Sequence, residues 1–253
     1  MDAADGRARK KLLFESVRGR VSTPMMFWRD HVQRHPQGLY LDVGANYGEC
    51  FAFGSYPTGS CVAIEANSHL IPYLERTRDD HPCRDRIKIV HALIAAERDE
   101  QASLFFDPKW TGGGSAAPGR SGLRELVVST ETLESILEKN APGHDSPIVM
   151  KMDIEGYEGQ ALKGFPSLFE WPRVVGILEF DTDLLSQAGT DARDLYELMA
   201  RHFSVYLTFN HQRRLQTLDS WEALQRCSGR GGRLHRDLVF ASSKDMISPG
   251  WLG

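Results

Sequence analysis

Short apolar runs rich in β-branched residues alternate along the chain with segments whose apolar residues recur at helical spacing. Residues 68–80 and 131–140 show the helical spacing and predict two helices. Apolar runs predict five strands, at residues 38–44, 61–66, 87–93, 147–153 and 173–180. Such alternation is typical of an α/β fold with a mostly parallel sheet covered by helices on both faces. The near-continuous apolar character of the runs places these strands at the centre of that sheet.

Two parts of the chain depart from this alternation. Residues 101–107 and 124–130 predict two added strands around a glycine-rich segment at residues 108–122, which we expect to be a loop. Closure of that loop over a ligand is the alternative. Near the end, residues 202–209 and 236–243 predict two more strands, with a helix at 219–227 between them. An antiparallel final pair at a sheet edge fits this pattern.

Length and composition limit the domain organisation and the function classes. The chain of 253 residues contains no Pro- or Ser-rich linker, so we expect one domain over residues 38–253 behind a helical extension at residues 1–37. The net charge of −4 and the lack of a basic aromatic stripe argue against nucleic acid as a partner. No apolar run is long enough to span a membrane, and no signal core or CxxC pair appears, so we expect a cytoplasmic protein without a membrane partner.

The segment "LDVGANYGE" at residues 41–49 lies where the first strand should turn into a helix. Its pattern is D-x-G-x-x-x-G, through Asp42, Gly44 and Gly48, and it fails the G-x-G-x-x-G fingerprint of dinucleotide sites. Asp42 and Glu49 flank the turn, although a pyrophosphate favours a helix N-terminus free of carboxylates. The turn therefore predicts a ligand that is not strongly anionic, and a dehydrogenase is disfavoured.

Glu65 ends the second predicted strand, some twenty residues beyond the glycines, where a carboxylate can accept both hydroxyls of a ribose. A ribose-bearing ligand without pyrophosphate, bound among carboxylates, suggests S-adenosylmethionine. The backbone N–H groups of the turn can hold its carboxylate, and Asp42 is the natural partner of its ammonium.

Four segments, "LDVGANYGE", "AIEAN", "TLESI" and "VMKMDIEGYEGQALKG", in that order, resemble FkbM-type methyltransferases of class I, which depend on S-adenosylmethionine. The resemblance covers residues 39–180. It implies a Rossmann-like, seven-stranded sheet with a reversed last strand, and it makes residues 38–253 the methyltransferase domain. It also implies O-methylation of a hydroxyl on a sugar or natural product. Where the family often has T-L-D and E-P-N, this chain has Glu134 and Ala66.

The resemblance also implies which residues bind the cofactor. They lie at or just beyond the carboxyl ends of the first three predicted strands, namely Asp42, Gly44, Ala45, Asn46, Gly48, Glu65, Ala66, Ala92 and Leu93. Asp153 is added because it ends the fourth predicted strand, and ligands of open α/β sheets bind beyond the strand ends. Ala92 and Leu93 are expected to pack against the adenine.

Three carboxylates, Asp153, Glu155 and Glu158, close the apolar run "IVMKM". Glu158 is expected to begin a helix, where the helix dipole stabilises a negative charge. For Asp153 and Glu155 three roles are open: stabilising the methionine end of the cofactor, assisting a substrate hydroxyl as general base, or binding a divalent metal, with Glu179 as a further ligand. An ion pair between Asp153 and Lys151 is the structural alternative.

His211, after the sixth predicted strand, is a third candidate catalytic residue beside Asp153 and Glu155, although a histidine there can simply be exposed. The sequence therefore predicts a methyltransferase acting on a small hydroxyl-bearing molecule. An RNA- or protein-directed methyltransferase and a non-catalytic cofactor-binding module are the alternatives. The oligomeric state, including a homodimer, is left open.

Overall fold

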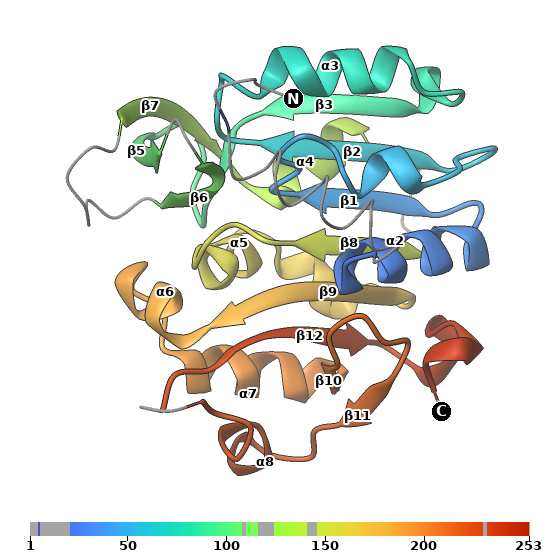
Figure 1. Cartoon of the computed structure of the whole chain (residues 1–253), viewed down its shortest axis with the longest axis vertical. Helices are drawn as coiled ribbons and strands as arrows, with labels where there is room; N and C mark the ends of the chain where they lie inside the picture. The colour runs from blue at the N-terminus through green and yellow to red at the C-terminus, as the bar shows by residue number, and fades with distance from the viewer. Residues whose placement is uncertain are drawn as a thin grey trace.

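The computed structural model describes residue 5 and residues 21–107, 110–115, 124–140, 146–229 and 232–252. Within these residues an eight-stranded sheet runs in the order β11-β10-β12-β9-β8-β1-β2-β3 (Figure 1). Its strands are β1 (Leu39–Val43), β2 (Ser60–Glu65), β3 (Ile87–His91), β8 (Ile148–Met152), β9 (Val174–Asp181), β10 (Ser204–Thr208), β11 (Leu215–Thr217) and β12 (His235–Ala241).

The five strands from β9 to β3 are parallel, and β12 runs antiparallel to both β9 and β10. This arrangement confirms the predicted Rossmann-like α/β fold with a reversed last strand. The predicted antiparallel pair does not lie at the edge, because β12 inserts between β9 and β10 and the short strand β11 adds outside β10. The sequence analysis did not predict β11, which is only three residues long.

Helices cover both faces of the sheet, as predicted. One face carries α2 (Thr23–Arg34) and α3 (Ile71–Asp79), and the other carries α4 (Leu133–Asn140), α5 (Glu158–Lys163) and α7 (Ala192–His202). All residues of β1 and β8 are buried, which explains their near-continuous apolar sequences. The other helices of the described residues are α6 (Thr182–Gln187), α8 (Trp221–Gln225) and the short 3₁₀ turns Phe51–Phe53, Arg84–Arg86, Pro166–Glu170, Lys244–Met246 and Pro249–Trp251.

The described part of the N-terminal extension packs into the hydrophobic core. The Ser22 hydroxyl caps α2 by accepting from the N–H of Met25 at 3.4 Å. Phe27 and Trp28 are fully buried, and the indole N–H of Trp28 donates to the hydroxyl of Tyr56 at 2.9 Å. Residues 1–4 and 6–20 of the predicted extension lie outside the described residues, and the division at residue 37 stays a prediction.

A second sheet, in the order β4-β7-β5-β6, lies beyond the carboxyl ends of the parallel strands (left in Figure 1). It contains β4 (Leu93–Ile94), β5 (Gln101–Asp107), β6 (Trp110–Ser115) and β7 (Arg124–Glu131). The prediction of a loop over the glycine-rich segment is wrong for residues 110–115, which pair with β5 as an antiparallel strand. Strand pairing uses backbone groups, so glycines can take part despite their low strand propensity. Residues 108–109 and 116–122 lie outside the described residues.

The predicted strand at 87–93 is also divided. It ends at His91 in the main sheet, and after Ala92 the chain enters the second sheet through β4. In the part of the chain that the structure describes, no helix has the length and apolar character needed to cross a membrane.

Candidate active site

A cavity of about 460 Å³ opens at the carboxyl ends of β1, β2, β8 and β9. Ligands of open α/β sheets bind at this edge, outside the ends of the parallel strands. The N-terminal turn of α2 and the connection between β10 and β11 contribute further walls, through Ser22–Met25 and through Asn210 and His211. The cavity therefore joins segments far apart in the sequence.

The glycine turn after β1 forms one wall of the cavity. The N–H groups of Gly44 and Ala45 both donate to the carbonyl of Ile64, each at 2.9 Å. Gly44 has a φ of +76°, and a Cβ there would lie 1.9 Å from the carbonyl oxygen of Asp153. Only glycine therefore allows the turn to pack this closely against the end of β8.

The second glycine of the turn has a different role. Gly48 has a φ of +84°, and a Cβ there would meet the ring of Phe51 at 2.4 Å. Among the predicted cofactor residues it is the one that does not line the cavity. Gly48 therefore shapes the turn from behind, while Gly44, Ala45 and Asn46 face the cavity.

Glu65 ends β2 and is held by two backbone donors. Its Oε2 accepts from the N–H of Asn46, and its Oε1 accepts from the N–H of Asn67, each at 2.8 Å. Burial raises the pKa of Glu65, and these two hydrogen bonds oppose the rise. The carboxylate is thus fixed at the cavity wall beside Ala66, with lone pairs left for a ligand. Ala92 and Leu93, both buried, line the same wall.

Asp42 is completely buried and faces the cavity from β1. Its Oδ2 accepts from the N–H of Phe51 at 3.2 Å, and its Oδ1 lies 3.6 Å from Nζ of Lys151. Burial raises the pKa of the Asp42 carboxyl, while the ammonium of Lys151 acts to lower it.

Lys151 was not among the predicted site residues. Its ammonium lies between Asp42 and Asp153, 4.0 Å from Oδ2 of the latter, and donates to the carbonyl of Gly44. Burial lowers the pKa of Lys151, but the two carboxylates more than offset this, and the pKa is raised overall. The predicted Asp153–Lys151 ion pair is present as one contact of this larger group. A lysine inside the apolar run "IVMKM" was the signal that could have indicated it.

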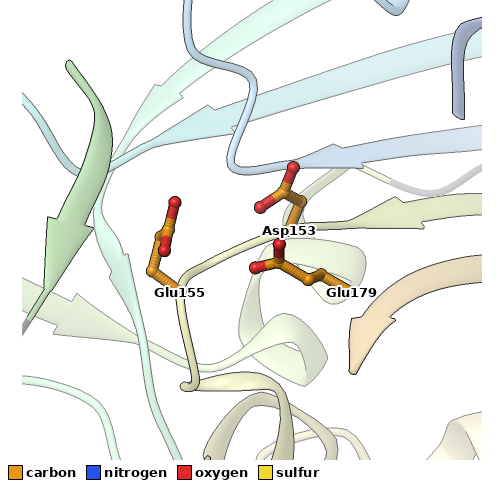
Figure 2. A group of neighbouring side chains, drawn as sticks. All are labelled: Asp153, Glu155 and Glu179. Carbon is orange, nitrogen blue, oxygen red and sulfur yellow. The ribbon is translucent and has the colours of Figure 1, made fainter. Parts of the chain in front are cut away.

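Asp153, Glu155 and Glu179 gather at the other side of the cavity (Figure 2). One carboxylate oxygen from each residue lies within 4.8 Å of the other two. The strand β8 ends at Met152, and beyond it the chain turns, with Glu155 at a φ of +55°. The third residue, Glu179, comes from β9 (Figure 2).

The electrostatic environment of this carboxylate cluster is unfavourable for full ionisation. Burial, followed by the neighbouring charges of Asp153 and Glu158, raises the pKa of Glu155 to about 8. Burial, followed by the charges of Asp153 and Glu155, raises the pKa of Glu179 to about 11. The cluster can therefore accept hydrogen bonds or a proton from a substrate, and its oxygens are of the kind that hold a divalent metal.

Glu158 begins α5, as predicted, and has a second structural role. Its Oε1 accepts from the N–H of Ile154 at 2.9 Å, which fixes the turn that carries Asp153 and Glu155. Its side chain is almost completely buried, and burial raises its pKa to about 7. Glu158 thus supports the cluster from behind and is not among the residues that line the cavity.

His211, which follows β10 in the chain, also lines the cavity. Its Nδ1 lies 3.1 Å from the carbonyl of Val21, and its backbone N–H donates to the hydroxyl of Thr23 at 3.0 Å. A carbonyl partner requires the proton on Nδ1, which leaves Nε2 as the acceptor of the ring. Further lining residues that the sequence analysis did not select include Met25, Leu104, Tyr157, Asn210 and Asp237.

A parallel sheet with a reversed last strand, a glycine turn after β1 and an acidic residue at the end of β2 are features of the Rossmann-like fold of class I methyltransferases. The family described as "Methyltransferase FkbM domain" matches residues 42–206, and the chain belongs to this family. The protein is therefore a methyltransferase that depends on S-adenosylmethionine. No curated protein sequence matches the chain.

Several solved structures are similar to this chain at low identity. They include precorrin-6y C5,15-methyltransferase from Geobacter metallireducens, with 10% identity, a TM-score of 0.44 and 87% of each chain covered. An O-methyltransferase from Bacillus cereus has 13% identity and a TM-score of 0.45, covering 95% of this chain and 90% of its own. The O-methyltransferase TomG from Streptomyces achromogenes has 12% identity and a TM-score of 0.43, covering 96% and 91%. Similarities this distant carry no information about the substrate.

Proposed function

We propose that this protein transfers a methyl group from S-adenosylmethionine to a hydroxyl of a sugar, a glycosylated molecule or another small natural product. The observation that carries the proposal is the cluster of Asp153, Glu155 and Glu179, which faces the same cavity as the glycine turn. Carboxylates accept hydrogen bonds from hydroxyls and can take up the proton that a hydroxyl loses on methylation.

The residues of the cofactor side fit S-adenosylmethionine. Glu65 is already oriented by two backbone N–H groups and can accept the ribose hydroxyls. Asp42 and Asp153 offer carboxylates to the ammonium and the sulfonium, and buried Ala92 and Leu93 offer an apolar surface to the adenine. When bound, S-adenosylmethionine supplies a methyl group on a cationic sulfur that is already activated for displacement.

Glu155 is the general base of this proposal. As the hydroxyl oxygen forms its bond to the methyl carbon, the Glu155 carboxylate takes the hydroxyl proton, while the carbon–sulfur bond breaks and its electrons stay on sulfur. With a pKa of about 8, Glu155 is ionised and able to act as the base mainly above that pH. His211, with Nε2 as its acceptor, is the second candidate for this role.

Positioning should contribute more than proton transfer to the rate. Holding donor and hydroxyl together supplies roughly 7–11 kcal/mol of the barrier. A general base adds about 10²–10⁴-fold, or roughly 3–5 kcal/mol. The buried and hydrogen-bonded groups of the cofactor side are therefore expected to matter most for rate.

A labelled-methyl transfer screen tests the proposal. The panel contains free sugars, glycosides, hydroxylated natural products, amines, RNA and protein, and the methylated atom is located by NMR. Methyl label on a hydroxyl oxygen of a small molecule supports the proposal, and label confined to nitrogen, RNA or protein contradicts it. Repeating the active reaction with a chelator, and then with added Mg²⁺, decides whether the carboxylate cluster also needs a metal.

Cofactor binding is tested separately by calorimetry. Asp153→Ala should lose most of the affinity for S-adenosylmethionine, whereas Asp80→Ala, which removes an exposed aspartate outside the cavity, should bind normally. Thermal-shift measurements with S-adenosylhomocysteine and NAD complete the test, since stabilisation by NAD alone would overturn the assignment.

A further inference from the structure

Lys151 is a buried cation in the middle of the cofactor side of the cavity. Its side chain is 9% exposed, and its ammonium lies near four protein oxygens. The donor bond to the carbonyl of Gly44 is the shortest contact; the carbonyl of Val43 is at 3.4 Å, Oδ1 of Asp42 at 3.6 Å and Oδ2 of Asp153 at 4.0 Å.

These four oxygens belong to three structural features. Val43 and Asp42 lie on β1, Gly44 begins the glycine turn, and Asp153 follows the end of β8. One ammonium thus connects the turn that shapes the cofactor side with the first residue of the carboxylate cluster. Removing Lys151 would leave the carbonyl of Gly44 without this donor and the carboxylate of Asp153 without this cation.

The same contacts contribute to the charge of the cavity wall around Lys151. Asp42, Asp153 and Lys151 together carry two carboxylates and one ammonium, which leaves one net negative charge. S-adenosylmethionine has a net positive charge from its sulfonium, while S-adenosylhomocysteine, the product, has none. Coulomb attraction in a partly buried site therefore favours the donor over the product, and the strength of that preference depends on Lys151.

We infer that Lys151 is a positioning residue of the cofactor site, which joins the glycine turn to Asp153 and sets the preference of the cavity for the cationic methyl donor over the neutral product. The inference rests on the proposed use of S-adenosylmethionine. Lys151 does not touch the acceptor in this role, and its effect on the rate is exerted through the turn and through Asp153.

The test measures binding by calorimetry at pH 8 for both S-adenosylmethionine and S-adenosylhomocysteine. Lys151→Met should weaken both ligands, because the turn and Asp153 lose their shared partner. It should also raise the ratio of the product Kd to the donor Kd about tenfold over wild type, since the wall becomes more negative. Lys151→Arg keeps the charge and should keep the ratio.

Two further variants control for misfolding and for effects of the substitution that are unrelated to the site. Asp42→Asn combined with Lys151→Met removes a buried ion pair as a whole, restores one net negative charge and should return the ratio close to the wild-type value. Lys88→Met makes the same substitution at an exposed position on β3, outside the cavity, and should change neither Kd.

The outcomes separate the inference from the proposed function. Wild-type protein that binds neither ligand would contradict the proposed function itself. Wild-type protein that binds both, with an unchanged Kd ratio in Lys151→Met, would overturn the inference, because a purely structural lysine would weaken both ligands in parallel.

Discussion

The carboxylates at the two ends of the cavity differ in their hydrogen-bond and ion-pair partners. At the cofactor end, Glu65 accepts from two backbone N–H groups, and Asp42 has a backbone N–H and the ammonium of Lys151. At the acceptor end, Glu155 and Glu179 form a cluster with Asp153, the carboxylate shared with the cofactor side, and one carboxylate oxygen of each residue lies within 4.8 Å of the other two. Among the described residues, no donor pairs with the buried Oε2 of Glu179.

This difference indicates how the two ends should respond to ligands. Groups that are already paired are rigid and preorganised, so the cofactor end needs little rearrangement on binding. Burial and neighbouring negative charges raise the pKa values of Glu155 and Glu179, so these two carboxylates gain most from an added donor, proton or cation. The acceptor end is therefore where protons and substrate hydroxyls are expected to be exchanged, and three changes test this distinction.

The largest effect is expected from Gly44→Ala at the cofactor end. The added Cβ would lie 1.9 Å from the carbonyl oxygen of Asp153, on a residue with a positive φ. We expect a loss of at least about 3 kcal/mol of stability and loss of detectable cofactor binding. Urea unfolding and calorimetry measure the two effects.

Gly189→Ala is the matched control for this change. Gly189 also has a positive φ, +74°, but no atom lies within 4 Å of the added Cβ. The substitution should lower the stability only by the strain of an alanine in the left-handed backbone conformation, about 1–2 kcal/mol. The affinity for the cofactor should stay unchanged. Equal losses for the two variants would show that close packing at Gly44 is unimportant.

The second effect concerns the acceptor end, where Glu155→Gln removes the proposed base with little change in shape. The single-turnover rate should fall about 10²-fold or more, while the Kd for S-adenosylmethionine changes less than about threefold. His211→Gln is the competing variant, since His211 lines the same cavity. A larger rate loss for His211→Gln than for Glu155→Gln would indicate that His211 is the general base.

The third effect is a change in the pH dependence of stability in Glu158→Gln. The folded pKa of Glu158 is about 7 against an ordinary value of 4.5, so the unfolded chain releases this proton first as the pH rises. The wild type therefore loses stability between pH 4.5 and about 7, by up to about 3 kcal/mol from this group. The glutamine keeps an acceptor for the N–H of Ile154 and removes the charge.

Urea unfolding of Glu158→Gln at pH 5 and pH 8 measures this effect. The variant should be more stable than wild type at pH 8 and close to it at pH 5. Glu75→Gln, at an exposed position on α3, should follow the wild-type curve. Parallel curves for Glu158→Gln and wild type would mean that burial of Glu158 carries no electrostatic cost.

Much of the fold could be predicted from local sequence patterns. Five apolar runs of strand length predicted the parallel strands, because a strand buried on both faces must be apolar at nearly every position. Asp191 followed by Leu195 and Met199 would also have predicted α7, since Asp191 caps the helix and the two apolar residues share its buried face. The pairing of glycine-rich β6 with β5 carried no such side-chain signal.

For the site, local sequence patterns were enough to predict which acidic residues end the strands, because strand ends and glycine turns are recognisable without knowledge of the fold. That placed Asp42, Glu65 and Asp153 at the cavity. The partners of these residues depend on the three-dimensional fold. Lys151 donates to the carbonyl of Gly44, 107 residues away in the chain, and Glu179 joins Asp153 and Glu155 from a different strand. Such contacts could not be predicted because charge and packing act between residues that are close in space, and the register of adjacent strands determines which residues are close.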